Sequence, residues 1–434
     1  MDRRRYLAAF AAVVGAGCAS TDTTPGHDSE NSSTETTPDR RSDEPPSDFP
    51  TDHGLWRCQL PDRFALTATS DALYVAKDAA LVCLSPAGET RWATDSDTDS
   101  YAIAEPHDLT VAGSTVYYTA RASTKTGEVG AYDTASGQQR WATTLGEVPD
   151  SLIGVTEDTV FASQSYDDPG EAPVFAFDAE TGDEQWRTKT GMDMGSAVAD
   201  GLCLVYSVVD GLTALDTATG EVQWEQALGG EYGARLRVID DTLCLFLAGT
   251  VHGYELQDGT HRWEQSLPGN ERFVQRPPLS ATEAADLYIA DDQASLTALT
   301  AATGEKQWTV ATSEDDEGYE GLCLGTETLF YHSGTVLASY DLVDGTRRWR
   351  YPFESEYDIS GPFVADGTVF LITLETEGEP SVRAFDAESG RLHWRRRLST
   401  GESFPPRISG VFDEYAALRT DTGLIGFPVS PSTP

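Results

Sequence analysis

The stretch that decides the fold of this chain is ALDTATGEVQW at residues 214–224, in which Gly220 stands four residues before Trp224. The same spacing occurs eight times at intervals of roughly forty residues, which is the signature of a repeat architecture. The pairs are Gly88/Trp92, Gly137/Trp141, Gly182/Trp186, Gly220/Trp224, Gly259/Trp263, Gly304/Trp308, Gly345/Trp349 and Gly390/Trp394.

Each repeat reads as a series of short strands. In the sixth repeat, the runs 287–290 and 296–299 precede the motif at 304–308, and Gly, Asp, Ser or Thr residues bound them. Such short β-branched or aromatic runs favour strands. No amphipathic stretch of helical length follows residue 55, so we expect an all-β fold.

The Trp residues allow two interpretations: a set that stacks on a cofactor, or wedges between neighbouring sheets. A single four-stranded sheet cannot bury its face alone. We therefore expect Trp92, Trp141, Trp186, Trp224, Trp263, Trp308, Trp349 and Trp394 to be wedges, and Gly137, Gly182, Gly220, Gly304 and Gly390 to be structural turn residues.

An Asp stands four residues before the Gly in five repeats. These carboxylates could serve catalysis or metal binding, or they could accept backbone N–H bonds in a turn. An active site is seldom built in five copies, which favours turn capping. The residues are Asp133, Asp178, Asp216, Asp341 and Asp386.

The repeat resembles that of the quinoprotein-like β-propellers, with matches at 176–186, 214–224 and 384–394. The resemblance implies four-stranded blades around a central channel. The family norm is eight blades, which we take as the expected count. A partial unit with strands at 415–418 and 424–427 leaves nine open. A lone strand at 54–60 could pair with the C-terminal strands and close the ring near the termini.

Residues 1–18 have the features of an export signal with a lipobox. Arg3, Arg4 and the residues up to Leu7 resemble the twin-arginine pattern, and the apolar run that follows is too short to span a bilayer. The run ends at Cys18, which we expect to be lipidated. Gly15 departs from the usual lipobox, so an ordinary signal or an uncleaved anchor is the alternative.

Residues 19–53 are rich in Ser, Thr, Pro and acidic residues, so we expect a disordered tether ahead of a propeller at 54–430. These features predict an extracytoplasmic protein, anchored to the outer face of the cell membrane through lipid at Cys18.

The net charge of −41 is extreme, and only four residues are Lys. This composition is typical of halophilic archaea, where salt screens the repulsion between acidic groups. An acidic surface argues against nucleic acid as a partner. We expect a monomer.

The remaining five Cys residues lie in apolar strand patterns and read as small buried hydrophobes. Cys203 and Cys244 occupy equivalent strands of adjacent repeats, so a bridge between them stays open. No Cys or His spacing indicates a metal site, and we assign no catalytic, cofactor or metal residues.

Three functions are compatible with this scaffold. The first is a non-catalytic protein-binding scaffold with an unknown membrane or cell-surface protein as partner. The second, implied by the resemblance, is a dehydrogenase that uses pyrroloquinoline quinone (PQQ) and Ca²⁺. Such enzymes use Glu and Asn ligands with an Asp base, and many carry adjacent Cys residues. This chain has no Cys pair and only Asn31 and Asn270. The third is a cell-surface glycan-binding module.

The chain also resembles in form the lipidated propeller that assists outer-membrane assembly in bacteria. From that resemblance we carry over only the mode of action, in which loops at one end of the ring dock a partner protein. Loops on a rigid scaffold commonly hold function. The long connections are 95–104, 122–129, 166–173 and 375–380, with a dense acidic loop at 313–320.

Overall fold

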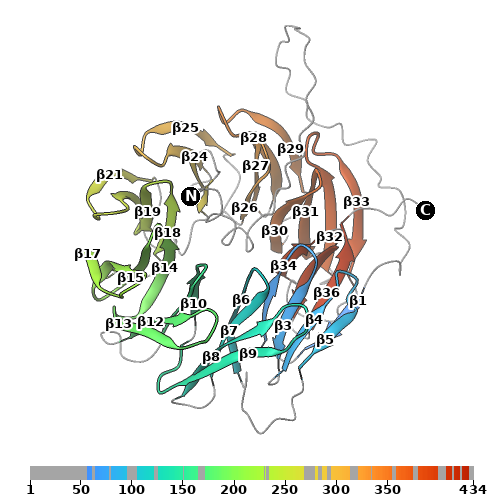
Figure 1. Cartoon of the computed structure of the whole chain (residues 1–434). Helices are drawn as coiled ribbons and strands as arrows, with labels where there is room; N and C mark the ends of the chain where they lie inside the picture. Colours follow the sequence, from blue (N-terminus) through green and yellow to red (C-terminus); the bar gives the residue numbers. More distant parts are fainter. Residues whose placement is uncertain are drawn as a thin grey trace, which may run out of the picture.

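The computed structural model shows a ring of four-stranded antiparallel sheets arranged as the blades of a β-propeller (Figure 1). The all-β prediction is confirmed. The export signal, the tether and Cys18 lie outside the described residues, as do most of the long connections. The structure describes residues 56–60, 64–77, 80–94, 105–121, 126–149, 151–164, 172–228, 230, 234–267, 279–281, 286–290, 295–312, 321–333, 335–353, 358–374, 380–398, 407–412, 415–420 and 423–429.

Each of blades 1 to 8 contains four consecutive strands, ordered from the channel outward. Blades 1 to 4 are formed by β2 (Ala65–Ala68), β3 (Leu73–Lys77), β4 (Ala80–Leu84) and β5 (Thr90–Ala93); β6 (Glu105–Ala112), β7 (Thr115–Arg121), β8 (Gly127–Asp133) and β9 (Gln139–Leu145); β10 (Ser151–Val155), β11 (Thr159–Ser163), β12 (Pro173–Asp178) and β13 (Glu184–Lys189); β14 (Asp193–Ala199), β15 (Leu202–Ser207), β16 (Gly211–Asp216) and β17 (Val222–Gln226).

Blades 5 to 8 continue the same order, and blade 9 is assembled from both ends of the described chain. Their strands are β18 (Arg235–Ile239), β19 (Thr242–Leu247), β20 (Thr250–Glu255) and β21 (His261–Ser266); β22 (Leu279–Ala281), β23 (Asp286–Ala290), β24 (Ser295–Thr300) and β25 (Lys306–Ala311); β26 (Gly321–Leu324), β27 (Thr328–Ser333), β28 (Val336–Asp341) and β29 (Arg347–Pro352); β30 (Asp358–Ala365), β31 (Thr368–Leu374), β32 (Pro380–Asp386) and β33 (Leu392–Arg397); and, in blade 9, β34 (Arg407–Phe412), β35 (Tyr415–Thr420), β36 (Gly423–Pro428) and β1 (Trp56–Gln59).

The described part of the chain thus forms nine blades, the count that the sequence left open, and the expected count of eight is corrected. The eight Gly-to-Trp motifs suggested eight units because blade 9 lacks that motif within its own sequence segment. Its outer strand is β1, so its Trp is Trp56, far away in the sequence. All nine Trp residues of the chain are then accounted for, one on the outer strand of each blade.

Pairing of β1 with β36 closes the ring between the two ends of the chain (Figure 1). The register runs antiparallel, from Trp56 opposite Gly426 to Gln59 opposite Gly423. This confirms the expected closure of the ring near the termini. Because β1 pairs with β36, the edge of β36 is covered at the seam.

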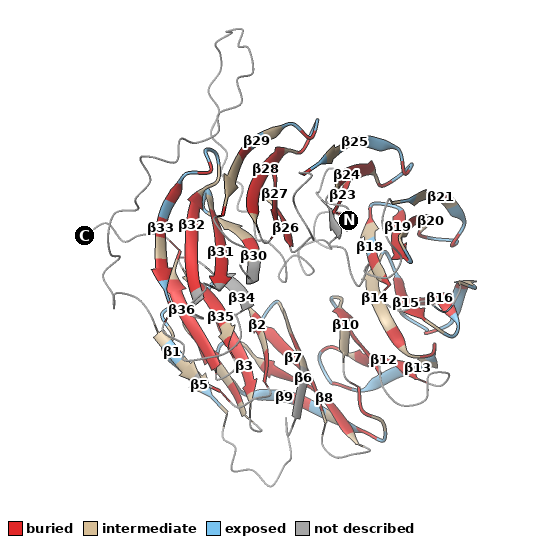
Figure 2. Cartoon of the chain, turned by 180° about the vertical axis from the view of Figure 1, so that it is seen from behind, coloured by how far each residue is buried: buried red, intermediate tan, exposed pale blue. Residues whose placement is uncertain are grey.

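The core is divided among the interfaces between blades. The second and third strands of a blade are buried on both faces, as in β15, where every residue is buried (Figure 2). Outer strands alternate: in β17, Trp224 is the buried residue among exposed neighbours. Nine apolar clusters result among the described residues, each shared by two adjacent blades. Each blade therefore depends on both neighbours for burial of its faces.

The two ends of the ring differ in their connections. At one end, which we call the cap end, the first strand of a blade turns into its second and the third into its fourth. In blade 4 these turns are joined by a bond from the Thr217 N–H to the Gly201 carbonyl. At the other end, the loop end, lie the turns between second and third strands and the connections from blade to blade.

Candidate functional site

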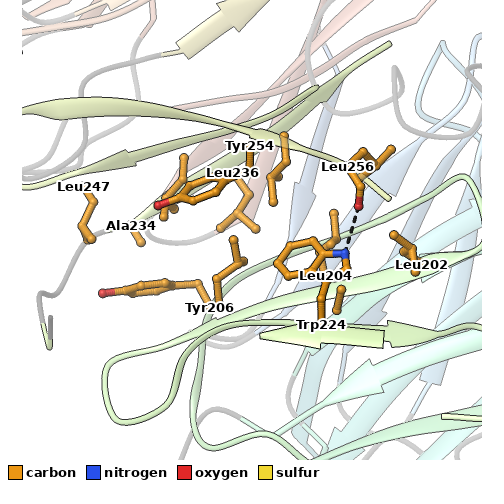
Figure 3. Packing of buried hydrophobic residues seen from close by; sticks show 13 residues of the cluster. Leu202, Leu204, Tyr206, Trp224, Ala234, Leu236, Leu247, Tyr254 and Leu256 are labelled. Atoms are coloured by element: carbon orange, nitrogen blue, oxygen red, sulfur yellow. Dashed lines mark hydrogen bonds between the residues drawn. The ribbon is translucent and has the colours of Figure 1, made fainter. Parts of the chain in front are cut away.

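The repeated Gly and Trp residues form one joint between each pair of neighbouring blades. Trp224 of blade 4 is buried, and its Nε1–H donates to the Leu256 carbonyl of blade 5 at 3.0 Å (Figure 3). Its ring lies on Gly259, where an added Cβ would stand 2.5 Å from Cε3 of the indole. Gly259 has φ of +70°, so this position needs Gly for its backbone and for the space.

The same joint recurs at eight junctions of the described ring. In each, the indole N–H donates to a carbonyl of the next blade, at 2.8 to 3.0 Å. The ring also covers the Gly of the next blade. Gly137, Gly182, Gly220, Gly304 and Gly390 receive Trp92, Trp141, Trp186, Trp263 and Trp349, respectively, and Gly88 receives Trp56 and Gly345 receives Trp308. The Trp set therefore acts as wedges between sheets.

Trp394 faces the remaining junction, between blades 8 and 9. It is buried and lies against the rings of Phe370 and Phe427. The sequence of blade 9 lacks the Gly motif, and Phe427 on its strand β36 supplies an aromatic contact to Trp394 at this junction.

The five repeated Asp residues serve the turns at the cap end. Asp178 Oδ1 accepts the N–H groups of Glu180 and Thr181 at 3.0 and 2.9 Å. Asp133, Asp216 and Asp386 accept from the residue three positions on, and Asp341 accepts from Val343. The backbone bond from Thr181 is the largest cause that lowers the pKa of Asp178. These carboxylates are thus committed to local structure.

Two inner-strand carboxylates, Asp108 and Asp193, link neighbouring blades. Asp108 on β6 accepts the Leu152 N–H of blade 3 at 2.9 Å. Asp193 on β14 is buried, and its Oδ2 accepts from the hydroxyl of Ser163 in blade 3 at 2.6 Å. Both side chains thus take part in structural hydrogen bonds between blades.

None of the five described Cys residues forms a disulfide bond. Cys203 lies in the cluster between blades 3 and 4, whereas Cys244 lies in the cluster between blades 5 and 6. The disulfide between Cys203 and Cys244, which the sequence left open, does not form, because the two thiols lie in different interfaces between blades. Burial raises the pKa of Cys244 to about 12, so this thiol stays protonated.

One group of potential metal ligands occurs among the described residues: His252 on β20 with His261 and Glu264 on β21. Sequence reasoning missed it, since the His residues are nine positions apart and only strand pairing joins them. Burial, followed by the nearby His261, lowers the pKa of His252, whereas Glu264 opposes that shift.

Comparison with known proteins places this geometry in a family. The family model described as "Outer membrane protein assembly factor BamB" matches residues 125–339 and 292–425, which together are most of the chain. The chain belongs to the BamB family. It is thus a propeller of PQQ-like repeats related to BamB, as the resemblance implied.

A curated BamB-family relative, from Burkholderia pseudomallei (strain K96243), is 26% identical over 258 residues. The match covers 55% of this chain and 64% of that protein, so it spans less than two thirds of the relative.

Solved propellers of low identity share the fold. BamB from Moraxella catarrhalis has a TM-score of 0.53 at 13% identity, covering 73% of this chain and 94% of that one. The computationally designed Ika8 protein has a TM-score of 0.52 at 13% identity, covering 74% and 96%.

The strands that flank the long connections show at which end of the ring these connections begin and end. The segments 95–104, 122–125, 165–171, 313–320 and 375–379 lie outside the described residues. The strands that flank them are described, and all of these strands end or begin at the loop end. In the described part of the chain there is no helix long and apolar enough to cross a membrane.

Proposed function

We propose that this chain is a non-catalytic protein-binding scaffold, held outside the cell membrane by its N-terminal tether. The observation that supports this most is the segregation of connections in a BamB-family ring. Tight, Asp-capped turns occupy the cap end, whereas the strands that flank the variable connections begin or end at the loop end. A rigid ring with varied loops at one end suits docking of a partner.

The proposed address rests on the sequence. The twin-arginine-like signal and Cys18 predict export and lipidation, and residues 19–53 would separate the ring from the bilayer. The printed name of the Burkholderia relative refers to outer-membrane assembly. We do not extend that role to this chain, because its composition indicates a halophilic archaeon without an outer membrane. The partner we propose is a protein of the cell membrane or cell surface, bound by a monomeric ring.

The experiment compares crosslinking from the two ends of the ring. Val209, in the turn between β15 and β16, is 54% exposed at the loop end, and Val343, in the turn between β28 and β29, is 85% exposed at the cap end. Val209→Cys and Val343→Cys would each be labelled with a photocrosslinker on the full chain in its native membrane at native salt. The wild-type protein, treated with the same crosslinker, controls for labelling of the natural Cys residues.

We expect Val209→Cys to capture the same protein reproducibly and Val343→Cys to capture none. Capture from the cap end alone would overturn the assignment of the docking end. Absence of any partner from either position would overturn the scaffold proposal itself.

The dehydrogenase alternative has a direct assay. Two inner-strand carboxylates, Asp108 and Asp193, do not favour it, since both bond to neighbouring blades. Sustained dye reduction with alcohols or sugars after addition of PQQ and Ca²⁺ would overturn the non-catalytic proposal. Retention on cell-surface polysaccharide would support the glycan-binding alternative instead.

A further inference from the structure

Three side chains at the outer part of blade 5 form a cluster suited to a metal ion. The potential ligand atoms of His252, His261 and Glu264 all lie within 4.8 Å of one another. His252 Nδ1 is 3.9 Å from Glu264 Oε2, and the two imidazole centroids are 5.8 Å apart.

A β-bulge produces this arrangement. His252 lies directly opposite Glu264, and Tyr254 opposite His261, with Arg262 as the extra residue of the bulge. Residues three apart on a regular strand point to opposite faces. The bulge corrects this for His261 and Glu264, so both point to the same face as His252.

Blade 3 confirms that these three positions are mutual neighbours. Its equivalent residues by register are Phe175, Glu184 and Arg187. Arg187 pairs with Glu184 at 2.6 Å and lies over the Phe175 ring at 5.2 Å. The blade geometry therefore brings whatever occupies these positions into contact.

Only the occupants differ between blades. Blade 4 has Thr213, Val222 and Glu225 at the three positions. Blade 6 has Thr297, Lys306 and Thr309, whose two hydroxyls lie 3.1 Å apart. Among these blades, blade 5 alone supplies two imidazoles and a carboxylate.

The surroundings hold the imidazoles in place while leaving the ligands accessible. The Tyr254 ring contacts His261 edge-on at 5.2 Å and lies 6.3 Å from the His252 ring. His261 and Glu264 are exposed, and His252 is partly buried. The positive charge of Arg262 is engaged by Asp241 and Glu255, so it does not oppose a bound cation.

We propose that His252, His261 and Glu264 form a binding site for a first-row transition-metal dication such as Zn²⁺. Imidazole ligands suit Zn²⁺, Cu²⁺ or Ni²⁺, whereas Mg²⁺ and Ca²⁺ prefer all-oxygen sites. Tetrahedral Zn²⁺ with bonds of about 2.0–2.1 Å needs ligand separations of about 3.4 Å. The exposed side chains reach this by small rotations. Three protein ligands leave one position open for water.

The test titrates untagged, chelator-treated full-length protein with Zn²⁺ at high KCl and with Mg²⁺ in excess. We expect one saturable site by calorimetry, a rise in melting temperature on binding, and a nitrogen and oxygen shell without sulfur by X-ray absorption. His261→Gln and Glu264→Gln, both at exposed positions, should each weaken binding at least about tenfold.

Two further variants make the test specific. His252→Thr places there the residue found in blades 4 and 6, and it should abolish the site. His393→Gln removes a surface His that lies 3.6 Å from Asp386 and belongs to no group of potential metal ligands among the described residues, and binding should be unchanged. Binding that survives His261→Gln, yields to Mg²⁺, shows sulfur ligation or disappears in His393→Gln would overturn the proposal.

Discussion

We expect Trp224→Ala to lower the free energy of unfolding by about 3–5 kcal/mol, the range for truncating a buried aromatic side chain to Ala. The indole is 8% exposed, and a buried Trp removes about 200 Å² from water, worth about 5 kcal/mol at 25 cal/mol per Å². The Leu256 carbonyl also loses its donor at 3.0 Å, which adds about 1 kcal/mol. The Ala that remains and relaxation of neighbours offset part of this sum.

The partner residue gives an independent measure of the same contact. In Gly259→Ala, the left-handed backbone at φ of +70° costs about 1 kcal/mol. The new Cβ would also meet the indole at 2.5 Å, and such overpacking costs about 1–3 kcal/mol more. In the Trp224→Ala background the second cost should vanish, giving a coupling of about 1–3 kcal/mol.

Gly367→Ala is the matched control, because Gly367 has φ of +69° and no atom within 4 Å of an added Cβ. Urea unfolding at high salt, followed by far-UV circular dichroism, would give the four free energies of the cycle. The reasoning is refuted if Gly259→Ala costs no more than Gly367→Ala, or if the double variant equals the sum of the singles.

Three further outcomes are expected. Burial lowers the pKa of His332 from 6.5 to about 4. The unfolded chain therefore binds this proton first, and the free energy of unfolding falls by up to about 3 kcal/mol as the pH drops from about 6.5 to 4. Urea titrations of His332→Phe should show a smaller fall with pH, and an unchanged dependence on pH would contradict this. Alkylation of the native protein, followed by mass spectrometry, should label half-buried Cys58 before buried Cys203. Denaturation should make both thiols reactive. Early labelling of Cys203 in the native protein would argue against its burial between blades 3 and 4. A chain of residues 54–434 should have the same melting temperature as a chain of residues 19–434. A chain of residues 61–434 lacks β1, so it should melt several degrees lower and aggregate. Equal melting temperatures for chains 54–434 and 61–434 would disprove the role of β1.

Much of the fold could be predicted from the Gly and Trp spacing, because that spacing encodes both the cap-end turn and the wedge into the next blade. The blade count could not be read from complete motifs. The ninth Trp, Trp56, stands on a strand that joins its blade only through long-range pairing with β36. Counting Trp residues rather than motifs would have given nine.

The potential metal site shows the limit of sequence reasoning more clearly. His252 and His261 have no recognised ligand spacing, and a regular strand would separate His261 from Glu264. The bulge that joins them is a feature of backbone pairing. Likewise, Cys203 and Cys244 are equivalent in the repeat, yet they face different interfaces between blades. Only the structure shows on which face of its blade each of these side chains lies.

The seam at blade 9 has a mechanical consequence. Any tension on the segment that precedes Trp56 is applied first to β1, which pairs with β36 over only four residues. Peeling this strand would withdraw Trp56 from the Pro86 carbonyl and from Gly88 of blade 1. Edges of blades 1 and 9 would then lose cover together, while the other joints stayed intact. If the ring is held by its N-terminal segment, as we propose, the proposed attachment point is also the place where pulling would open the ring.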